Sequence, residues 1–383
     1  MEKSIKVGFL SQQNYLDKNT FSGTLYYMHQ ALQSQGLDLV DLKTPRAPSL
    51  LTKVVNRAVS KVRSSAQEDA SNLLKFKRQV QKVLDARPCD VIFAPVASQE
   101  VSLIETDIPI IFSSDATPKL IHNDYYKIYA SEADFVSAAD AEKRVVAKAS
   151  RFVYPSHWSA ESAISDYGAD PQHVSVVPFG ANLDFAPEID QIRNRLTSSR
   201  CRLLFIGKDW QRKGGNLAFE SLLKLLALGI DAELTMIGCI PPDEAVAQVD
   251  KSRLTVIPFL NKNVKKERDR LYSIFLDAHF FLFPTRADCS PIVLCEAAAF
   301  GLPAMSSHVG GIPTIIEEGV NGYTFPLEAD GEKYAKQMAE LFSDQDKYRR
   351  LVLSSRDAYE KRLNWDAWAA RVAGVIHELL PVR

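Results

Sequence analysis

Short apolar runs rich in β-branched residues alternate with longer stretches of helical periodicity along most of this chain. Such alternation is typical of parallel β-sheets whose strands are joined by crossover helices. In the first half, strands are expected over residues 5–10, 90–94, 108–113, 151–155 and 174–177. In the second half, they are expected over residues 202–206, 232–237, 254–259, 279–284, 304–306 and 322–325. The pattern therefore predicts an α/β fold with two sheets.

The length of the chain and one polar junction predict two domains. At 383 residues the chain exceeds the roughly 250–300 residues that one hydrophobic core usually supports. Proline and glycine punctuate residues 178–182, and a charged connector follows. We expect two doubly wound, Rossmann-like domains, formed by residues 1–185 with a C-terminal helix at about 366–383 and by residues 186–365. Ligands of such sheets bind beyond the carboxyl ends of the strands, which predicts a site in a cleft between the domains.

Composition narrows the classes of function. A formal net charge of −1 disfavours a general nucleic-acid binder, because neutralising phosphates requires a cationic excess. No apolar run approaches the roughly 20 residues of a spanning helix, and the first residues lead straight into an expected strand. The five cysteines are scattered without metal-ligand spacing, which is typical of reduced thiols. We therefore expect a cytoplasmic protein without a zinc site.

The segment 43–87 has an unusual charge balance, with eleven basic and three acidic residues. On a helix, Lys53, Arg57 and Lys61 would stack beside an apolar face. One interpretation is a solvated helix rim. The other, equally weighted, is a surface for an anionic partner such as membrane phospholipid or a lipid-linked acceptor, which would place the protein peripherally at a membrane.

A helix start follows the expected strand 279–284. Ser290 is a preferred N-cap residue, and Pro291 suits the first helical position because its missing N–H would have been unpaired there. The N–H groups of Ile292 and Val293 would then point out of the helix start. Together with the helix dipole they predict a site for an anion such as a diphosphate.

Two carboxylates flank this helix start. Asp288 precedes it and Glu296 lies inside it, where both could accept hydrogen bonds from the vicinal hydroxyls of a sugar. Glu296 stands among leucine, cysteine and alanine residues, and burial there is costly unless a partner satisfies the carboxylate. The alternative is an ordinary surface glutamate.

A glycine-bounded cationic loop follows the expected strand 202–206. Glycines at both ends of residues 207–215 allow close backbone approach to a ligand, and Lys208, Arg212 and Lys213 supply cations at a strand end. A leaving diphosphate gains negative charge as its bond to a sugar breaks, and fixed cations would stabilise that transition state. A solvated turn is the alternative for any single lysine.

These motifs together resemble the nucleotide-sugar domain of retaining glycosyltransferases of the GT-B fold, the large family four group. The shared pattern is a basic residue after a strand-end glycine, then Lys-Gly, two acids separated by seven residues, and Ala-x-Gly-x-Pro. It spans roughly residues 200–330 here. Residues 21–24 resemble the family's glycine loop after the first strand, and residues 155–158 and 177–182 resemble its approach to the linker.

The resemblance implies roles for five catalytic or donor-holding side chains. Lys208 and Lys213 would contact the diphosphate, Glu296 would hold the ribose, and Asp288 would contact the transferred sugar. Asp115 stands where many relatives have a strand-end histidine facing the sugar. Asp288 replaces the usual glutamate and Lys208 a common arginine, which leaves the identity of the donor open.

The resemblance also implies a backbone cradle for the phosphates. Gly23 would bring amides to them from the amino-terminal domain. Ser290, Pro291, Ile292 and Val293 would cap them from the other side.

The implied activity is transfer of a hexosyl group from a UDP- or GDP-linked sugar to a glycan, lipid-linked or small-molecule acceptor, with retention at the anomeric carbon. The leaving phosphate would help to take the acceptor proton, and no metal or other cofactor is expected. One alternative is a non-catalytic sugar-nucleotide-binding scaffold on the same fold. A second is a phosphorylase-like enzyme that uses pyridoxal phosphate. Asp344 and Asp346 have the spacing of metal-binding acids, but their position favours a turn between helices.

Overall fold

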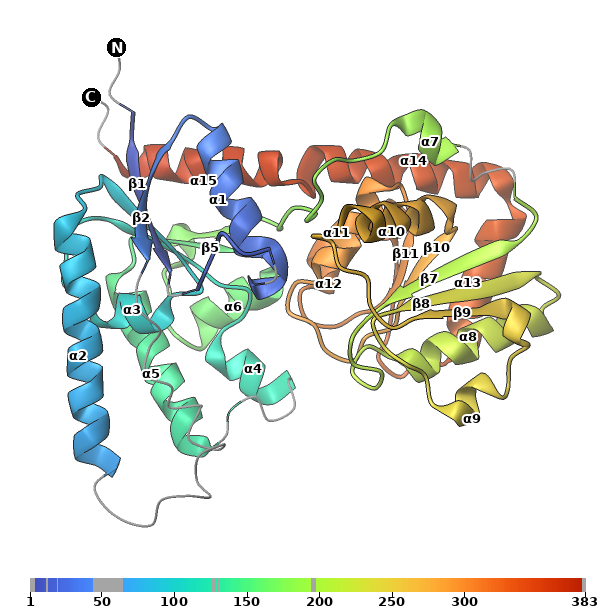
Figure 1. Ribbon diagram of the computed structural model, residues 1–383, viewed down its shortest axis with the longest axis horizontal. Coiled ribbons are helices and arrows are strands. Elements are labelled where there is room, and N and C mark those ends of the chain that lie inside the picture. Colours follow the sequence, from blue (N-terminus) through green and yellow to red (C-terminus); the bar gives the residue numbers. More distant parts are fainter. Residues whose placement is uncertain are drawn as a thin grey trace. The chain divides into compact units, whose positions relative to one another are not determined.

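The computed structural model describes residues 4–11, 13–18, 20–43, 65–124, 129, 131–193 and 198–380. The chain divides into two compact units. The first unit comprises Met1–Val177 with Trp368–Arg383, and the second comprises Pro178–Ala367. Each unit is built around its own parallel sheet (Figure 1).

The sheet of the first unit has the strand order β2-β1-β3-β4-β5-β6, with every pair parallel. Its strands are β1 Lys6–Ser11, β2 Asp38–Lys43, β3 Val91–Pro95, β4 Ile110–Ser113, β5 Arg151–Tyr154 and β6 Val174–Val176. The five strands expected here are confirmed. Strand β2 was not anticipated, because Asp38 and Asp41 interrupt its apolar residues, which an edge strand tolerates.

Helices connect these strands, and polar caps fix where several of them begin. The helices are α1 Thr24–Ser34, α2 Ser65–Ala86, α3 Ser98–Leu103, α4 Pro118–Asp124, α5 Glu132–Lys148, α6 His157–Ser165 and, from the C-terminal end, α15 Trp365–Leu379. Ser131 caps α5 by accepting from the Asp134 amide, and Ser156 caps α6 in the same way.

Strand β3 forms the centre of the first unit's core, since all five of its residues are buried. The ring of Phe93 lies 5.8 Å from that of Phe9 on β1 and 5.8 Å from the fully buried Trp368 on α15. These aromatic contacts attach the end of the chain to the sheet of the first unit. Truncating a buried tryptophan of this kind costs about 3–5 kcal/mol.

The second unit has the strand order β12-β11-β10-β7-β8-β9, again entirely parallel. Its strands are β7 Cys201–Ile206, β8 Ala232–Ile237, β9 Leu254–Ile257, β10 Phe280–Phe283, β11 Ala304–Ser307 and β12 Gly322–Phe325. All six expected strands are confirmed. Strand β9 ends two residues early, because Pro258 has no N–H to continue the ladder.

The helices of the second unit are α7 Ile189–Arg193, α8 Gly215–Ala227, α9 Asp243–Val246, α10 Lys265–Asp277, α11 Ile292–Ala299, α12 Ile312–Ile315, α13 Gly331–Ser343 and α14 Gln345–Arg362. Asp344 caps α14 by accepting from the Lys347 amide at 2.9 Å. It therefore occupies the expected turn between two helices.

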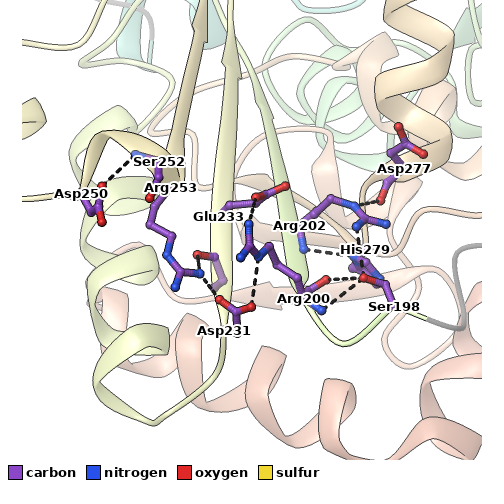
Figure 2. A network of polar contacts seen from close by, with 11 residues as sticks. Ser198, Arg200, Arg202, Asp231, Glu233, Asp250, Ser252, Arg253, Asp277 and His279 are labelled. Atoms are coloured by element: carbon purple, nitrogen blue, oxygen red, sulfur yellow. Dashed lines mark hydrogen bonds and ion pairs between the residues drawn. The ribbon is translucent and has the colours of Figure 1, made fainter.

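Figure 2 shows a polar network at the amino-terminal edge of the second sheet. Arg200 contacts Asp231 at 3.0 Å and Glu233 at 3.1 Å, and Arg253 pairs with the same Asp231. The Arg202 amide donates to His279 Nδ1 at 3.0 Å. These partly exposed pairs each contribute little. Together they join the starts of β7, β8 and β9, at the edge opposite the strand ends where ligands bind.

Part of the basic segment 43–87 lies outside the described residues, including Lys53, Arg57 and Lys61. In its described part, Lys77 pairs with Glu105, and Arg87 lies 3.8 Å from a carboxylate oxygen of Asp41. Across the described ranges, the structure contains no helix with the length and apolar character needed to cross a membrane.

Candidate functional site

The candidate site lies at the topological switch point of the second sheet, where the connections between strands change direction. Strands β7 and β10 are neighbours, but the chain continues from β7 toward β8 on one side and from β10 toward β11 on the other. Beyond the carboxyl ends of two such strands an open α/β sheet has a crevice. The loop 207–214 leaves β7 and the loop 284–291 leaves β10. These two loops carry most of the predicted site residues.

An ion pair between Lys213 and Asp288 joins the two loops. The side chains are 15% and 12% exposed, so water screens the pair only weakly. Lys213 Nζ also lies 4.7 Å from the centroid of the Phe283 ring, at the end of β10. Burial lowers the pKa of Lys213, and the neighbouring Asp288 carboxylate partly offsets that shift. The pair thus holds a cation and a carboxylate together at the switch point.

Arg212 adds a second cation and a set of backbone contacts. Its Nη1 donates to the Ala287 carbonyl at 3.0 Å and lies 3.9 Å from an Asp288 oxygen. Its own carbonyl accepts from the Arg286 amide at 2.7 Å and from the Thr285 hydroxyl at 3.0 Å. The two loops are therefore held against each other by main-chain as well as charged contacts.

Two glycines make this close approach possible. A Cβ on Gly214 would lie 1.9 Å from the Pro284 carbonyl oxygen, and its φ is +76°. A Cβ on Gly310, which has a φ of +54°, would lie 1.9 Å from the carbonyl oxygen of Asp288. Only glycine satisfies both the left-handed conformation and the lack of space. The backbone packing that positions Asp288 therefore depends on these residues.

Lys208 differs from Lys213 and Asp288 in its exposure to solvent. Its side chain is exposed, and its Nζ lies 5.8 Å from the ring of Phe259, which follows β9. Phe259 is itself 56% exposed. The structure therefore groups Lys213, Arg212 and Asp288, and directs Lys208 toward the loop after β9.

Helix α11 begins one residue later than expected. Pro291, with φ −71° and ψ 104°, is the N-cap, so helical geometry starts at Ile292. The prediction that Ser290 caps this helix and that Pro291 is its first residue is wrong. Ser290 Oγ is buried, with no hydrogen-bond partner in the described part of the chain. The amides of Ile292 and Val293 still stand in the first turn, where a helix provides no acceptor for them.

Glu296 is buried on α11, with 3% of its surface exposed. Its carboxylate forms an ion pair with Lys262, from the loop after β9. Burial raises the pKa of Glu296, and Lys262 acts in the opposite direction. The expected partner for a buried glutamate is therefore present, but sequence reasoning missed Lys262. Its position just after an expected strand was the available signal.

Two predicted residues belong to the first unit. Gly23 is buried, has a φ of 85° and precedes helix α1. Phe21 and Ser22 just before it also have positive φ angles, of 49° and 56°. Asp115 is half-buried and follows β4. Both residues stand after carboxyl ends of the first sheet, and their functional roles stay predictions.

The described residues contain no group of three or more histidine, cysteine or acidic side chains placed to hold a metal ion.

The fold and the site together define a class: an α/β protein of two Rossmann-like units with paired charges at a switch point. The family model of Glycosyltransferase Family 4 matches residues 23–185, and that of Glycosyl transferases group 1 matches residues 200–344. The chain belongs to this family of glycosyltransferases. The resemblance carried by residues 207–215 and 288–303 is thereby confirmed.

Known proteins agree with this assignment. A D-inositol 3-phosphate glycosyltransferase of Xylanimonas cellulosilytica is 28% identical over 261 residues, which cover 61% of this chain and 58% of the relative. The chain spans about half the length of the curated relatives it matches.

Solved structures confirm the GT-B fold. Sucrose-phosphate synthase of Thermosynechococcus elongatus aligns with a TM-score of 0.67 and 16% identity, over 98% of this chain and 99% of its own. The HepE protein of Anabaena in complex with UDP-glucose aligns with a TM-score of 0.63 and 14% identity, over 98% and 100% of the two chains.

Proposed function

We propose that this protein is a retaining hexosyltransferase that moves a sugar from a UDP- or GDP-linked donor to a hydroxyl group of an acceptor. The observation that carries the proposal is the Lys213–Asp288 pair across the switch point of the second sheet, beside Arg212 and the start of α11. A diphosphate needs fixed cations and free amides, and a sugar needs hydrogen-bond acceptors. This site offers all three.

In the proposed reaction, the bond between the anomeric carbon and the donor phosphate breaks and its electrons pass to the diphosphate. Lys213 and Arg212 stabilise the charge that develops there. The acceptor oxygen bonds to the anomeric carbon on the same face, and its proton goes to the leaving phosphate. Asp288 accepts hydrogen bonds from the sugar, and Glu296 accepts them from the ribose.

Known proteins support the choice of first substrates. The Anabaena HepE structure holds UDP-glucose, which supports a UDP-linked donor. The matched relatives are named for D-inositol 3-phosphate, which supports a phosphorylated, hydroxyl-rich small molecule as the first acceptor to assay. Because Lys213 and Arg212 already offset phosphate charge, we expect transfer to need no metal, which activity in the presence of a chelator would check.

The decisive experiment is a panel of UDP-, GDP- and ADP-sugars, assayed for binding and for slow hydrolysis without acceptor. Binding with turnover supports a transferase. Binding without turnover, with any acceptor tried, supports a non-catalytic scaffold. Failure to bind every donor contradicts the proposal. Absorbance of pyridoxal phosphate in the purified protein would indicate the phosphorylase-like alternative.

Two variants test the residue assignments. Glu296→Ala should weaken nucleotide binding, whereas Asp288→Asn should chiefly impair turnover and sugar choice. Normal activity in both variants would show that the site is wrong even if the fold is right.

Peripheral membrane contact through the basic segment 43–87 stays a proposal from the sequence. Reversing the charges of Lys53, Arg57 and Lys61 should reduce binding to anionic phospholipid vesicles. Unchanged partitioning would contradict it.

A further inference from the structure

Glu296 and Lys262 form an ion pair that is unevenly exposed. The carboxylate side chain is 4% exposed, whereas that of Lys262 is 38% exposed. Among the described residues, Lys262 is the cation that forms an ion pair with this carboxylate. The charge on Glu296 is thus buried, and the charge that compensates it comes from a loop.

The backbone around Lys262 is held by its neighbours. The amide of Asn261 donates to Glu267 Oε2 at 2.7 Å, at the start of α10. The amide of Asn263 donates to Asn261 Oδ1 at 3.0 Å, and that of Val264 donates to the Asn261 carbonyl at 3.0 Å. These bonds fix the chain on both sides of Lys262. The loop therefore presents the lysine to Glu296 from a defined position.

Other titratable groups near Glu296 do not replace this cation. Arg362 on α14 acts electrostatically on the neighbouring Cys295, but its own ion-pair partner is Glu317, at 2.9 Å. Tyr272 on α10 and Cys295 on α11 both interact electrostatically with Glu296. Burial raises the pKa of each, to about 12 in both cases, so both are neutral near pH 7. Without Lys262, burial would favour the protonated form of Glu296.

We propose that Lys262 is a positioning residue that keeps Glu296 ionised and oriented to receive the ribose hydroxyls of the donor nucleotide. This inference rests on the proposed function, in which Glu296 holds the ribose. An ionised carboxylate can accept a hydrogen bond from each of the two vicinal hydroxyls. A protonated carboxyl group carries an O–H donor and has lost part of this capacity to accept. Lys262 thus acts on the nucleotide through Glu296.

The test compares Lys262→Met with Lys262→Arg, and uses Lys265→Met as a control for loss of a surface charge. Lys265 pairs with Asp269 on the exposed face of α10, and in the described part of the chain it forms no ion pair with Glu296. Dissociation constants are measured for UDP and for 2′,3′-dideoxy-UDP between about pH 6 and about pH 9 by calorimetry.

We expect Lys262→Met to weaken UDP binding about tenfold near pH 6, which corresponds to loss of one or two hydrogen bonds, and to recover as the pH rises. Dideoxy-UDP should lose no more than a fraction of its affinity. Lys262→Arg and Lys265→Met should bind like the wild type. A Lys262→Met defect that is equal at every pH and for both nucleotides would overturn the inference, because Lys262 would then contact the phosphates directly. Unchanged UDP binding would overturn it as well.

A second readout needs no nucleotide. Burial already raises the folded-state pKa of Glu296 in the wild type, and loss of Lys262 should raise it further. Lys262→Met should therefore keep its full stability at low pH and lose more of it than the wild type as the pH rises through the folded-state pKa of Glu296. Adding Glu296→Gln should remove this slope. A slope that persists in the double variant, or a slope in Lys262→Met no steeper than that of the wild type, would contradict the inference. If the wild type binds none of UDP, GDP and ADP, the proposed function fails, whereas the slope still reports whether Lys262 controls Glu296.

Discussion

The carboxyl edges of the two sheets carry unusual residues of different kinds. In the second unit, the loops after β7 and β10 carry paired charges, and within the described residues every positive φ in this unit belongs to glycine. In the first unit, the loops after β1 and β3 place Phe21, Ser22 and Val96 at positive φ. A β-branched residue such as Val96 rarely adopts this conformation.

The difference shows two ways of building a site on one architecture. The second unit uses glycine so that charged loops can approach, which costs little strain. The first unit keeps the non-glycine residues Phe21, Ser22 and Val96 in left-handed conformations, and the surrounding structure must hold them there. The amide of Val96 donates to the Ser113 carbonyl at 2.7 Å, and Ser98 donates to the buried Glu142 at 3.0 Å. The loops of the first unit are thus marked by strained backbone, whereas those of the second unit are marked by paired charges.

The largest expected effect concerns the charged edge. Lys213→Met should lower kcat by about 100- to 1000-fold, because it removes a preorganised cation from the leaving phosphate. Steady-state kinetics on the donor found by the panel would measure this loss, with Lys224→Met as the matched control, since Lys224 pairs with Glu332 on the exposed surface of α8. Equal losses in both variants would show that the pairing of Lys213 with Asp288 gives it no special role.

The next largest effect concerns Glu142, the buried carboxyl group that accepts from Ser98 in the first unit. Burial raises the pKa of Glu142 to about 7, although the hydrogen bond from Ser98 opposes the shift. Its contribution to stability is therefore complete below about pH 4.5 and is lost as the pH rises through about 7, by about 3 kcal/mol in all. Glu142→Gln should flatten this dependence in urea unfolding curves. A free energy of unfolding that does not change with pH across that range in the wild type would show that Glu142 does not titrate in this way.

A smaller effect separates left-handed backbone from crowding. Gly214 in the second unit and Gly36 in the first both have a φ of +76°, but a Cβ on Gly36 would meet no atom within 4 Å. Gly36→Ala should cost about 1 kcal/mol from the backbone alone. Gly214→Ala should cost about 2 kcal/mol more, because its Cβ would meet the Pro284 carbonyl. Chemical unfolding of both variants would measure the difference, and equal costs would show that the loops yield.

The smallest effect concerns Val96 itself. Val96→Gly should raise the free energy of unfolding, or leave it within about 1 kcal/mol of the wild type, because relief of strain offsets the lost side chain and the added chain entropy. Val176→Gly, at a half-buried position of the extended strand β6, has no strain to relieve and should destabilise. Equal destabilisation by both would show that Val96 is not strained.

The sequence predicted the strands well where buried residues form continuous apolar runs, as in β3 and β10. It failed at β2, whose acidic residues are tolerated only because the strand lies at the sheet edge. Edge position depends on strand order, which a local pattern does not reveal.

Within the site, the sequence identified Lys213, Asp288 and Glu296 as important charged residues but paired none of them. Lys262 was missed because its contact with Glu296 depends on how the loop after β9 meets α11, 34 residues along the chain. Ser290 was assigned as the cap because it is a good cap residue, although the extended conformation of Pro291 delays the helix. Side-chain propensity thus predicted the element and not its first residue.

Two buried cysteines allow the opening of the second unit to be followed chemically. Cys201 lies at the start of β7 and Cys295 inside α11, both with no exposed surface, and burial raises the pKa of each thiol far above its ordinary value. A thiol reagent reacts with thiolate, so neither sulfur can be modified while the unit is closed. The rate at which these two sulfurs become modified would therefore count the openings of the second unit, and a bound nucleotide should slow that count in proportion to its affinity.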